Sequence, residues 1–226
     1  MATVLRSSAL WEVAKLIPKW EEMINALELR QGKELTAKFS AAVTAVCGLG
    51  GLGSNIAILL ARAGVKKLIL IDFDRVDVTN LHRQQYKAAQ VGRYKTEALS
   101  ENLKEIAPYT EIEFHTVRMD ESNIPELLKD ADIVCEAFDS AENKAMLTNT
   151  VLERLPDKFL VAASGMAGIG SPNAVRTRKI TNRFYLCGDE VSDVNSGIGL
   201  VSSRVALCAA HQAHTVLRLL AGEFDI

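Results

Sequence analysis

The sequence contains no apolar run long enough to cross a membrane, and its first residues do not predict a signal peptide. Its four cysteines form no C-x-x-C pair, so neither a disulfide framework nor a zinc ribbon is expected. The 26 basic residues nearly balance the 28 acidic ones, which argues against nucleic acid or a membrane surface as the main partner. These absences favour a cytoplasmic protein in a reducing compartment.

The chain of 226 residues, 48% of them hydrophobic, is long enough for one α/β domain with a full core. We expect a single domain over 1–226, with a helical lead-in over 1–40 and the α/β core over 41–226. Within the lead-in, apolar spacing predicts a helix over 8–30 that Pro18 kinks or divides. No internal repeat or low-complexity linker separates these parts.

The most informative stretch begins with an apolar run over 42–47, which is typical of a buried parallel strand. A glycine turn in G-x-G-x-x-G spacing follows, then a helical pattern over 54–63 and a second strand over 68–71 that ends at Asp72. This order is that of the first βαβ unit of a nucleotide-binding sheet. The glycines let backbone N–H groups approach a phosphate at the positive end of the helix, and Asp72 is placed to bind ribose hydroxyls. The turn contains Gly48, Gly50, Gly51 and Gly53.

Strands and helices alternate along the rest of the chain. Such alternation predicts an α/β fold, a doubly wound and mostly parallel Rossmann-like sheet with helices on both faces. Two further strands, at 174–179 and 183–186, are expected to pair away from the main sheet. The other strands are expected over 111–117, 132–136 and 159–163, and the helices over 95–106, 122–129, 141–155 and 199–220.

The segment 73–94 lacks any periodicity, and long irregular loops inside compact domains are usually functional or disordered. Interleaved apolar residues argue against disorder here. Ligands of open α/β sheets bind beyond the carboxyl ends of the strands, so this loop, the glycine turn and Asp139 after a later strand belong on one rim. The polar residues of the loop that matter here are Asp74, Asn80, Arg83 and Gln84.

The charged residues of this rim favour ATP over NAD. A triphosphate concentrates about four negative charges at one end, which calls for cations and a magnesium ion. Arg83 and Lys95 are placed to supply the cations, and Asp139 to hold magnesium. The pyrophosphate of a dinucleotide usually needs little more than the helix N-terminus.

Each of these residues also has a purely structural interpretation. Arg83 would then pair with a neighbouring aspartate, and Lys95 would be an ordinary lysine in the first turn of a helix. Asp139 would be only the N-cap of the helix that follows it. Asn80 and Gln84 would merely hold their own loop together.

Several stretches resemble the ThiF/MoeB/HesA family, the bacterial relatives of ubiquitin-activating enzymes. They are GLGGLGSNIA, LILIDFDRVDVTNLHRQQY, VGRYKTEAL and EAFDS. The D-F-D-x-V-x-x-x-N-L-x-R-Q run is far more specific than the glycine motif. GMAGIGSPN and GLVSSRVALCAAHQAH look like the shorter thiamine-biosynthesis branch, the sulfur-carrier adenylyltransferases.

The resemblance implies an adenylyltransferase that uses ATP and Mg²⁺ to adenylate the C-terminal glycine of a small ubiquitin-like sulfur-carrier protein. Such a carrier ends in Gly-Gly and resembles ThiS of thiamine thiazole synthesis, although molybdopterin and amino-acid pathways share the chemistry. A homodimer is also implied. The residues expected to bind the nucleotide are Gly48, Gly50, Gly51, Gly53, Asp72, Asp74, Asn80, Arg83, Gln84, Lys95 and Asp139, of which Arg83, Lys95 and Asp139 are expected to act in catalysis.

The sequence departs from the family pattern in two ways. The two C-x-x-C pairs that hold zinc in many relatives are missing, so no zinc is expected. The loop over 189–197 has no cysteine where relatives place a thiol, which leaves Cys187 at its base as the candidate. An NAD(P)-dependent oxidoreductase and a non-catalytic carrier-binding scaffold remain the competing hypotheses.

Overall fold

The computed structural model describes residues 17–193 and 197–226. Within this part of the chain, a seven-stranded sheet has the order β3-β2-β1-β4-β5-β7-β6. All neighbouring strands pair in parallel except β6 and β7, which are antiparallel. The predicted α/β class and mostly parallel sheet are confirmed. The strands are β1 (Val43–Cys47), β2 (Lys67–Ile71), β3 (Glu111–His115), β4 (Ile133–Glu136), β5 (Phe159–Ala163), β6 (Arg176–Lys179) and β7 (Phe184–Gly188).

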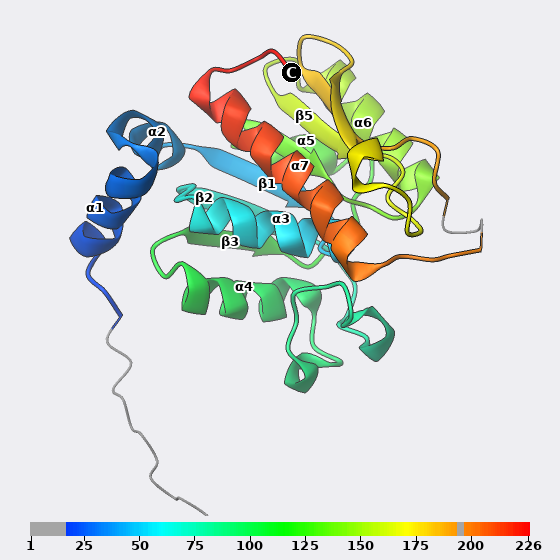
Figure 1. Ribbon diagram of the computed structural model, residues 1–226, viewed down its shortest axis with the longest axis horizontal. Coiled ribbons are helices and arrows are strands. Elements are labelled where there is room, and N and C mark those ends of the chain that lie inside the picture. Colours follow the sequence, from blue (N-terminus) through cyan, green and yellow to red (C-terminus); the bar gives the residue numbers. More distant parts are fainter. Residues whose placement is uncertain (1–16, 194–196) are drawn as a thin grey trace, which may run out of the picture.

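Helices cover both faces of this sheet (Figure 1). One face packs against α3, α4 and α7, and the other against α5 and α6. The helices of the described residues are α1 (Trp20–Gln31), α2 (Lys33–Phe39), α3 (Gly51–Arg62), α4 (Lys95–Ile106), α5 (Ile124–Leu128), α6 (Ala141–Arg154) and α7 (Ser202–Ala221), with single 3₁₀ turns η1 (Val78–Asn80), η2 (Ala88–Gln90) and η3 (Pro172–Ala174).

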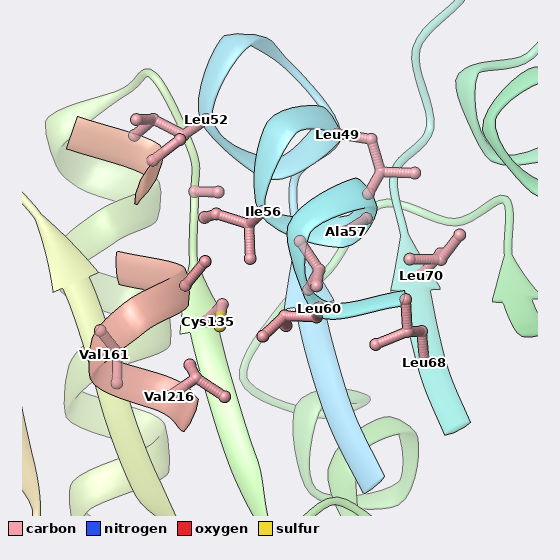
Figure 2. Close-up of a cluster of buried hydrophobic side chains, with 14 of the residues drawn as sticks. Leu49, Leu52, Ile56, Ala57, Leu60, Leu68, Leu70, Cys135, Val161 and Val216 are labelled. Carbon is pink, nitrogen blue, oxygen red and sulfur yellow. The ribbon is translucent and has the colours of Figure 1, made fainter. Parts of the chain in front are cut away.

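The two cores follow from the period of two along each buried strand. On β1, Val46 faces the core beneath α3 and α7, whereas Ala45 and Cys47 face the core beneath α5 and α6. Figure 2 shows the first core, in which Ile56 and Leu60 of α3 lie between β2, β4 and α7. The carboxyl ends of β1, β2 and β4 therefore open onto one rim, since these strands are parallel neighbours.

Two sequence-based expectations need correction. Strands β6 and β7 do not pair away from the main sheet, because β7 extends it by pairing in parallel with β5. The buried Tyr185 and Cys187 of β7 supply the apolar face that makes this possible. Helix α3 begins at Gly51 rather than Ser54, since the glycines carry no apolar signal. Gly32, which has φ 90°, separates α1 from α2, which starts directly after it.

The lead-in lies partly outside the described residues. The predicted helix over 8–30 is seen as α1 from Trp20 onward, with Pro18 just before it. Residues 8–16 of that prediction fall outside the described part of the chain. No helix in the described ranges is long and apolar enough to span a membrane.

Replacing Gly53 by alanine is expected to destabilise the fold by about 3 kcal/mol. An added Cβ would lie 1.8 Å from the carbonyl oxygen of Gly48, so α3 would have to move away from the glycine turn. Gly50→Ala is the matched control, because its Cβ would lie 3.7 Å from the nearest atom, the Gln84 amide nitrogen. Urea unfolding of both variants measures the difference. Equal stability of the two would show that the close approach at Gly53 is not a constraint.

Candidate functional site

The site lies where β1, β2 and β4 end, and the glycine turn forms its floor. Gly48 has φ 89° and donates its N–H to the Ile71 carbonyl at 2.8 Å, which ties the turn to β2. Helix α3 then starts at Gly51, so its first N–H groups face the rim. Backbone donors and the positive end of a helix dipole make such a turn suitable for phosphate.

Asp72 anchors the turn. Its Oδ2 accepts the Leu49 N–H at 2.6 Å and its Oδ1 accepts the Asp74 N–H at 2.7 Å. Burial raises the pKa of Asp72, and the charge of Lys95 opposes this shift. The carboxylate oxygens retain further lone pairs, so the ribose role expected for Asp72 stays a prediction beside the bonds that the structure shows.

Lys95 is buried at the start of α4 and is not an ordinary solvated lysine of a first turn. Only 5% of it is exposed, and its Nζ lies 2.8 Å from Asp74 Oδ2 and 3.8 Å from Asp72 Oδ2. Asp74 is thereby a counter-ion that holds Lys95 at the rim. Because both aspartates pair with Lys95, the alternative pairing of Arg83 with one of them is not what the structure shows.

Arg83 is oriented by its own loop. Its Nη2 donates to Asn80 Oδ1 at 2.8 Å and its Nη1 to the Thr79 carbonyl at 3.4 Å. Burial lowers the pKa of Arg83, and the charge of Asp139 opposes this shift although the two residues come from separate parts of the chain. The aliphatic part of Arg83 lies next to the start of α3, where its Cγ is 3.4 Å from the position that a Cβ on Gly51 would occupy.

Gln84 differs from Asn80, because no described hydrogen bond of its carboxamide oxygen holds the loop together. It is 7% exposed, and its Oε1 has no hydrogen-bond partner among the described residues. Its Nε2 lies 3.7 Å from the position that a Cβ on Gly50 would occupy. A buried carboxamide oxygen without a partner beside the glycine turn is a candidate to bind a ligand there.

Asp139 follows β4 and is exposed at the rim. It does not cap α6, because Ser140 is the N-cap and accepts the Asn143 N–H at 3.4 Å. In nucleotide sites Mg²⁺ is usually bound by one or two carboxylates together with phosphate oxygens. Asp139 fits that donor set. No three His, Cys, Asp or Glu side chains within the described ranges could hold a metal ion by themselves, so Asp139 would bind Mg²⁺ only together with a phosphate.

A family model described as "ThiF family" matches residues 24–225. The chain belongs to the ThiF family. Among solved structures, E. coli tRNA N6-threonylcarbamoyladenosine dehydratase (TcdA) in complex with ATP superposes with a TM-score of 0.80 at 22% identity, over 90% of this chain and 96% of TcdA. E. coli MccB superposes with a TM-score of 0.66 at 21% identity, over 84% of this chain and 60% of MccB. At such identities the likeness establishes the fold alone.

Curated relatives are longer than this ThiF-family chain. The adenylyltransferase and sulfurtransferase MOCS3 of Caenorhabditis briggsae is 37% identical over 123 residues, which are 54% of this chain and 30% of MOCS3. The adenylyltransferase and sulfurtransferase UBA4 of Lodderomyces elongisporus is 27% identical over 215 residues, 92% of this chain and 45% of UBA4. The chain therefore spans less than half the length of either relative.

The candidate thiol Cys187 lies in an environment that disfavours a nucleophile. It is fully buried on β7, and burial raises its pKa although hydrogen bonds with Thr177 and Thr215 oppose that shift. A nucleophilic cysteine needs an accessible thiolate. Cys47, Cys135 and Cys208 are buried as well, so they belong to the packed interior.

A hollow of ≈ 420 Å³ lies at the opposite end of the sheet and does not belong to this rim. It is lined by Trp20 and Leu27 of α1, by Ala61 near the end of α3, and by Tyr109 before β3. We place the functional site at the glycine turn because the unpartnered carboxamide of Gln84 and the charges of Lys95 and Arg83 converge there. The hollow is mainly apolar, and the charged residues of its lining are Arg62, Lys66 and Glu111.

Sequence reasoning missed three polar residues around the rim. Glu136 at the end of β4 is buried against Lys144, and a glutamate in an otherwise apolar strand is a signal that could have revealed a partner. Arg204 of α7 bonds the carbonyls of Ala167, Gly170 and Ser171 and pairs with the Asp189 carboxylate. The two ring nitrogens of His82 lie 3.1 Å from the Thr79 and Leu200 carbonyl oxygens, one each. No local sequence pattern indicates these contacts of Arg204 and His82.

Proposed function

We propose that this chain adenylates the C-terminal carboxylate of a small sulfur-carrier protein, using ATP. One observation carries the proposal. A buried lysine and an oriented arginine flank a glycine turn at a helix N-terminus, and the exposed carboxylate of Asp139 acts on the charge of that arginine. That arrangement suits a triphosphate and exceeds what a dinucleotide needs.

The residues act by positioning and by neutralising charge. The glycine turn and the start of α3 would hold phosphate oxygens, while Arg83 and Lys95 would offset charge that builds on the phosphates. Asp139 would hold Mg²⁺, which when bound screens the phosphate charge. The carrier carboxylate attacks the α-phosphorus, an acyl–O–P bond forms, and the bond to the β-phosphate oxygen breaks to release pyrophosphate. No nucleophile from this chain is required.

The identity of the carrier is a finer proposal. A ThiS-like carrier of the thiamine pathway rests on the motifs in 165–173 and 199–214. The names of MOCS3 and UBA4, adenylyltransferases and sulfurtransferases, make other sulfur carriers the main alternative. We also infer a homodimer from the family, which analytical ultracentrifugation would test. The decisive observation is which small protein with a Gly-Gly end co-purifies with this chain.

Calorimetry is expected to show that ATP with Mg²⁺ binds and that NAD does not. Lys95 and Arg83 provide two cations for a triphosphate end, and this charge would be largely unused by a dinucleotide. Micromolar binding of NAD without a signal for ATP would instead support the oxidoreductase alternative.

Pyrophosphate exchange into ATP tests the reaction itself. Exchange is expected to depend on a carrier ending in Gly-Gly and to vanish with a carrier that lacks the final glycine, because the carboxylate of the shortened tail would lie about 3.5 Å short of the α-phosphorus. ATP binding without exchange, for each of the thiamine, molybdopterin and amino-acid carriers, would favour the non-catalytic scaffold.

A further inference from the structure

A buried ion pair lies directly behind the loop that carries Asp139. Glu136, the last residue of β4, is 1% exposed. Lys144 of α6 donates to both of its carboxylate oxygens, at 3.1 and 3.0 Å, and to the Ala163 carbonyl at 3.0 Å. The pair therefore joins the ends of β4 and β5 to the start of α6.

The same carboxylate also holds the turn that follows β4. Glu136 Oε1 accepts the Phe138 N–H at 2.7 Å, and the Ala137 N–H donates to the Cys47 carbonyl at 2.9 Å. This turn lies against the glycine turn, because the Ala137 oxygen and the Phe138 ring come within 3.0 Å of where a Cβ on Gly48 would be. Asp139 is the next residue after Phe138.

A third side chain fixes this corner from the opposite face of the sheet. The fully buried Gln212 of α7 donates to the Glu136 carbonyl at 2.9 Å and to the Val161 carbonyl at 3.3 Å. Buried ion pairs are a poor source of stability, because removing two charges from water costs about as much as their attraction returns. The bond to Phe138 gives this pair a geometric role that stability alone does not explain.

We propose that Glu136, held by Lys144, is a positioning residue that sets the Ala137–Phe138 turn and so places Asp139 beside the glycine turn. The proposal rests on the function proposed above, in which Asp139 binds Mg²⁺ together with the nucleotide. It assigns no chemical step to Glu136 itself, whose carboxylate is enclosed.

Two matched double variants test this role. Glu136→Gln/Lys144→Met removes both charges but keeps an oxygen that can accept the Phe138 N–H. Glu136→Leu/Lys144→Met removes the same charges and the acceptor as well. Because both variants lack the ion pair, comparing their melting temperatures provides the control for folding. Hydrogen exchange of the Phe138 amide reports directly on the turn.

The readout is the gain in ATP affinity when Mg²⁺ replaces EDTA, measured by calorimetry. We expect Glu136→Gln/Lys144→Met to show the same Mg²⁺-dependent gain in ATP affinity as the wild type. In Glu136→Leu/Lys144→Met this gain should be about tenfold smaller, as is typical when a residue supporting a metal ligand is removed. Affinity in EDTA should be the same in both. In an Asp139→Asn background the two double variants should not differ, since the effect acts through Asp139.

A gain in the leucine variant equal to that of the wild type would overturn the positioning role and leave the proposed function standing. A wild-type protein that binds no ATP, with or without Mg²⁺, would overturn the proposed function and this inference with it. Equal exchange of the Phe138 amide in the two variants would also refute the role, whatever the nucleotide does.

Discussion

Replacing Arg83 by lysine is expected to lower carrier-dependent pyrophosphate exchange by roughly a hundred- to thousand-fold, the equivalent of about 2.7–4 kcal/mol of transition-state stabilisation. Bonds to Asn80 and Thr79 orient the guanidinium before any ligand binds. Lysine keeps the charge but loses the planar set of donors. The loss should appear in turnover more than in ATP affinity, because the contact is strongest in the transition state.

Arg75 provides a control from the same loop. It is exposed, stacks over Tyr94 and donates to the Gly92 carbonyl, so Arg75→Lys should leave turnover near normal. Steady-state exchange rates and calorimetric ATP affinities for Arg83→Lys, Arg83→Ala and Arg75→Lys make the comparison. Near-normal turnover in both Arg83 variants would remove Arg83 from the active site.

Replacing Asp139 by alanine is expected to nearly abolish exchange while changing the free energy of unfolding by less than about 0.5 kcal/mol. The carboxylate is exposed and does not cap α6, so its removal disturbs little of the fold. In the function proposed above, its loss would remove the protein ligand that orients Mg²⁺ on the phosphates. Exchange assays and urea unfolding of the same preparation separate the two effects.

Ser140→Ala is the matched control, one residue away. The Ser140 hydroxyl accepts the Asn143 N–H at the start of α6, so its removal should cost about 1 kcal/mol of stability. Exchange should persist in this variant below its unfolding transition. If Asp139→Ala retained activity and lost stability instead, Asp139 would have a structural role that the geometry does not suggest.

Much of the fold could be predicted because its signals are local. The apolar run at β1, the glycine turn and the strand ending at Asp72 were placed correctly within a residue or two. Helix α4 begins at Lys95 and ends at Ile106, as its apolar spacing predicts. The position of strand β6 outside the main sheet was predicted wrongly, because its sequence RTRK has no apolar alternation and resembles a solvent-exposed hairpin. Its place in the sheet depends on β7, which pairs with β5, a strand distant from it in the sequence.

The candidate site was predicted as a set of residues but not as a set of contacts. The sequence placed Asp74, Arg83 and Lys95 near one another, yet several ion pairs among them were possible. In the structure Lys95 forms an ion pair with Asp74, and Arg83 donates a hydrogen bond to Asn80. Such choices depend on side-chain directions after the strands are assembled, and no spacing along the chain encodes them.

The sequence by itself determined that a glycine turn stands between a buried strand and a helix, because the spacing of glycines and apolar residues is a property of neighbours along the chain. Only the tertiary structure decided that the end of β4 lies against that turn. The sheet order places β4 directly beside β1, and the buried contacts of Glu136 with Lys144 and the Phe138 N–H then set the turn that carries Asp139. That corner depends on strands far apart in sequence, since a buried carboxylate is stabilised only by the partners that folding brings to it.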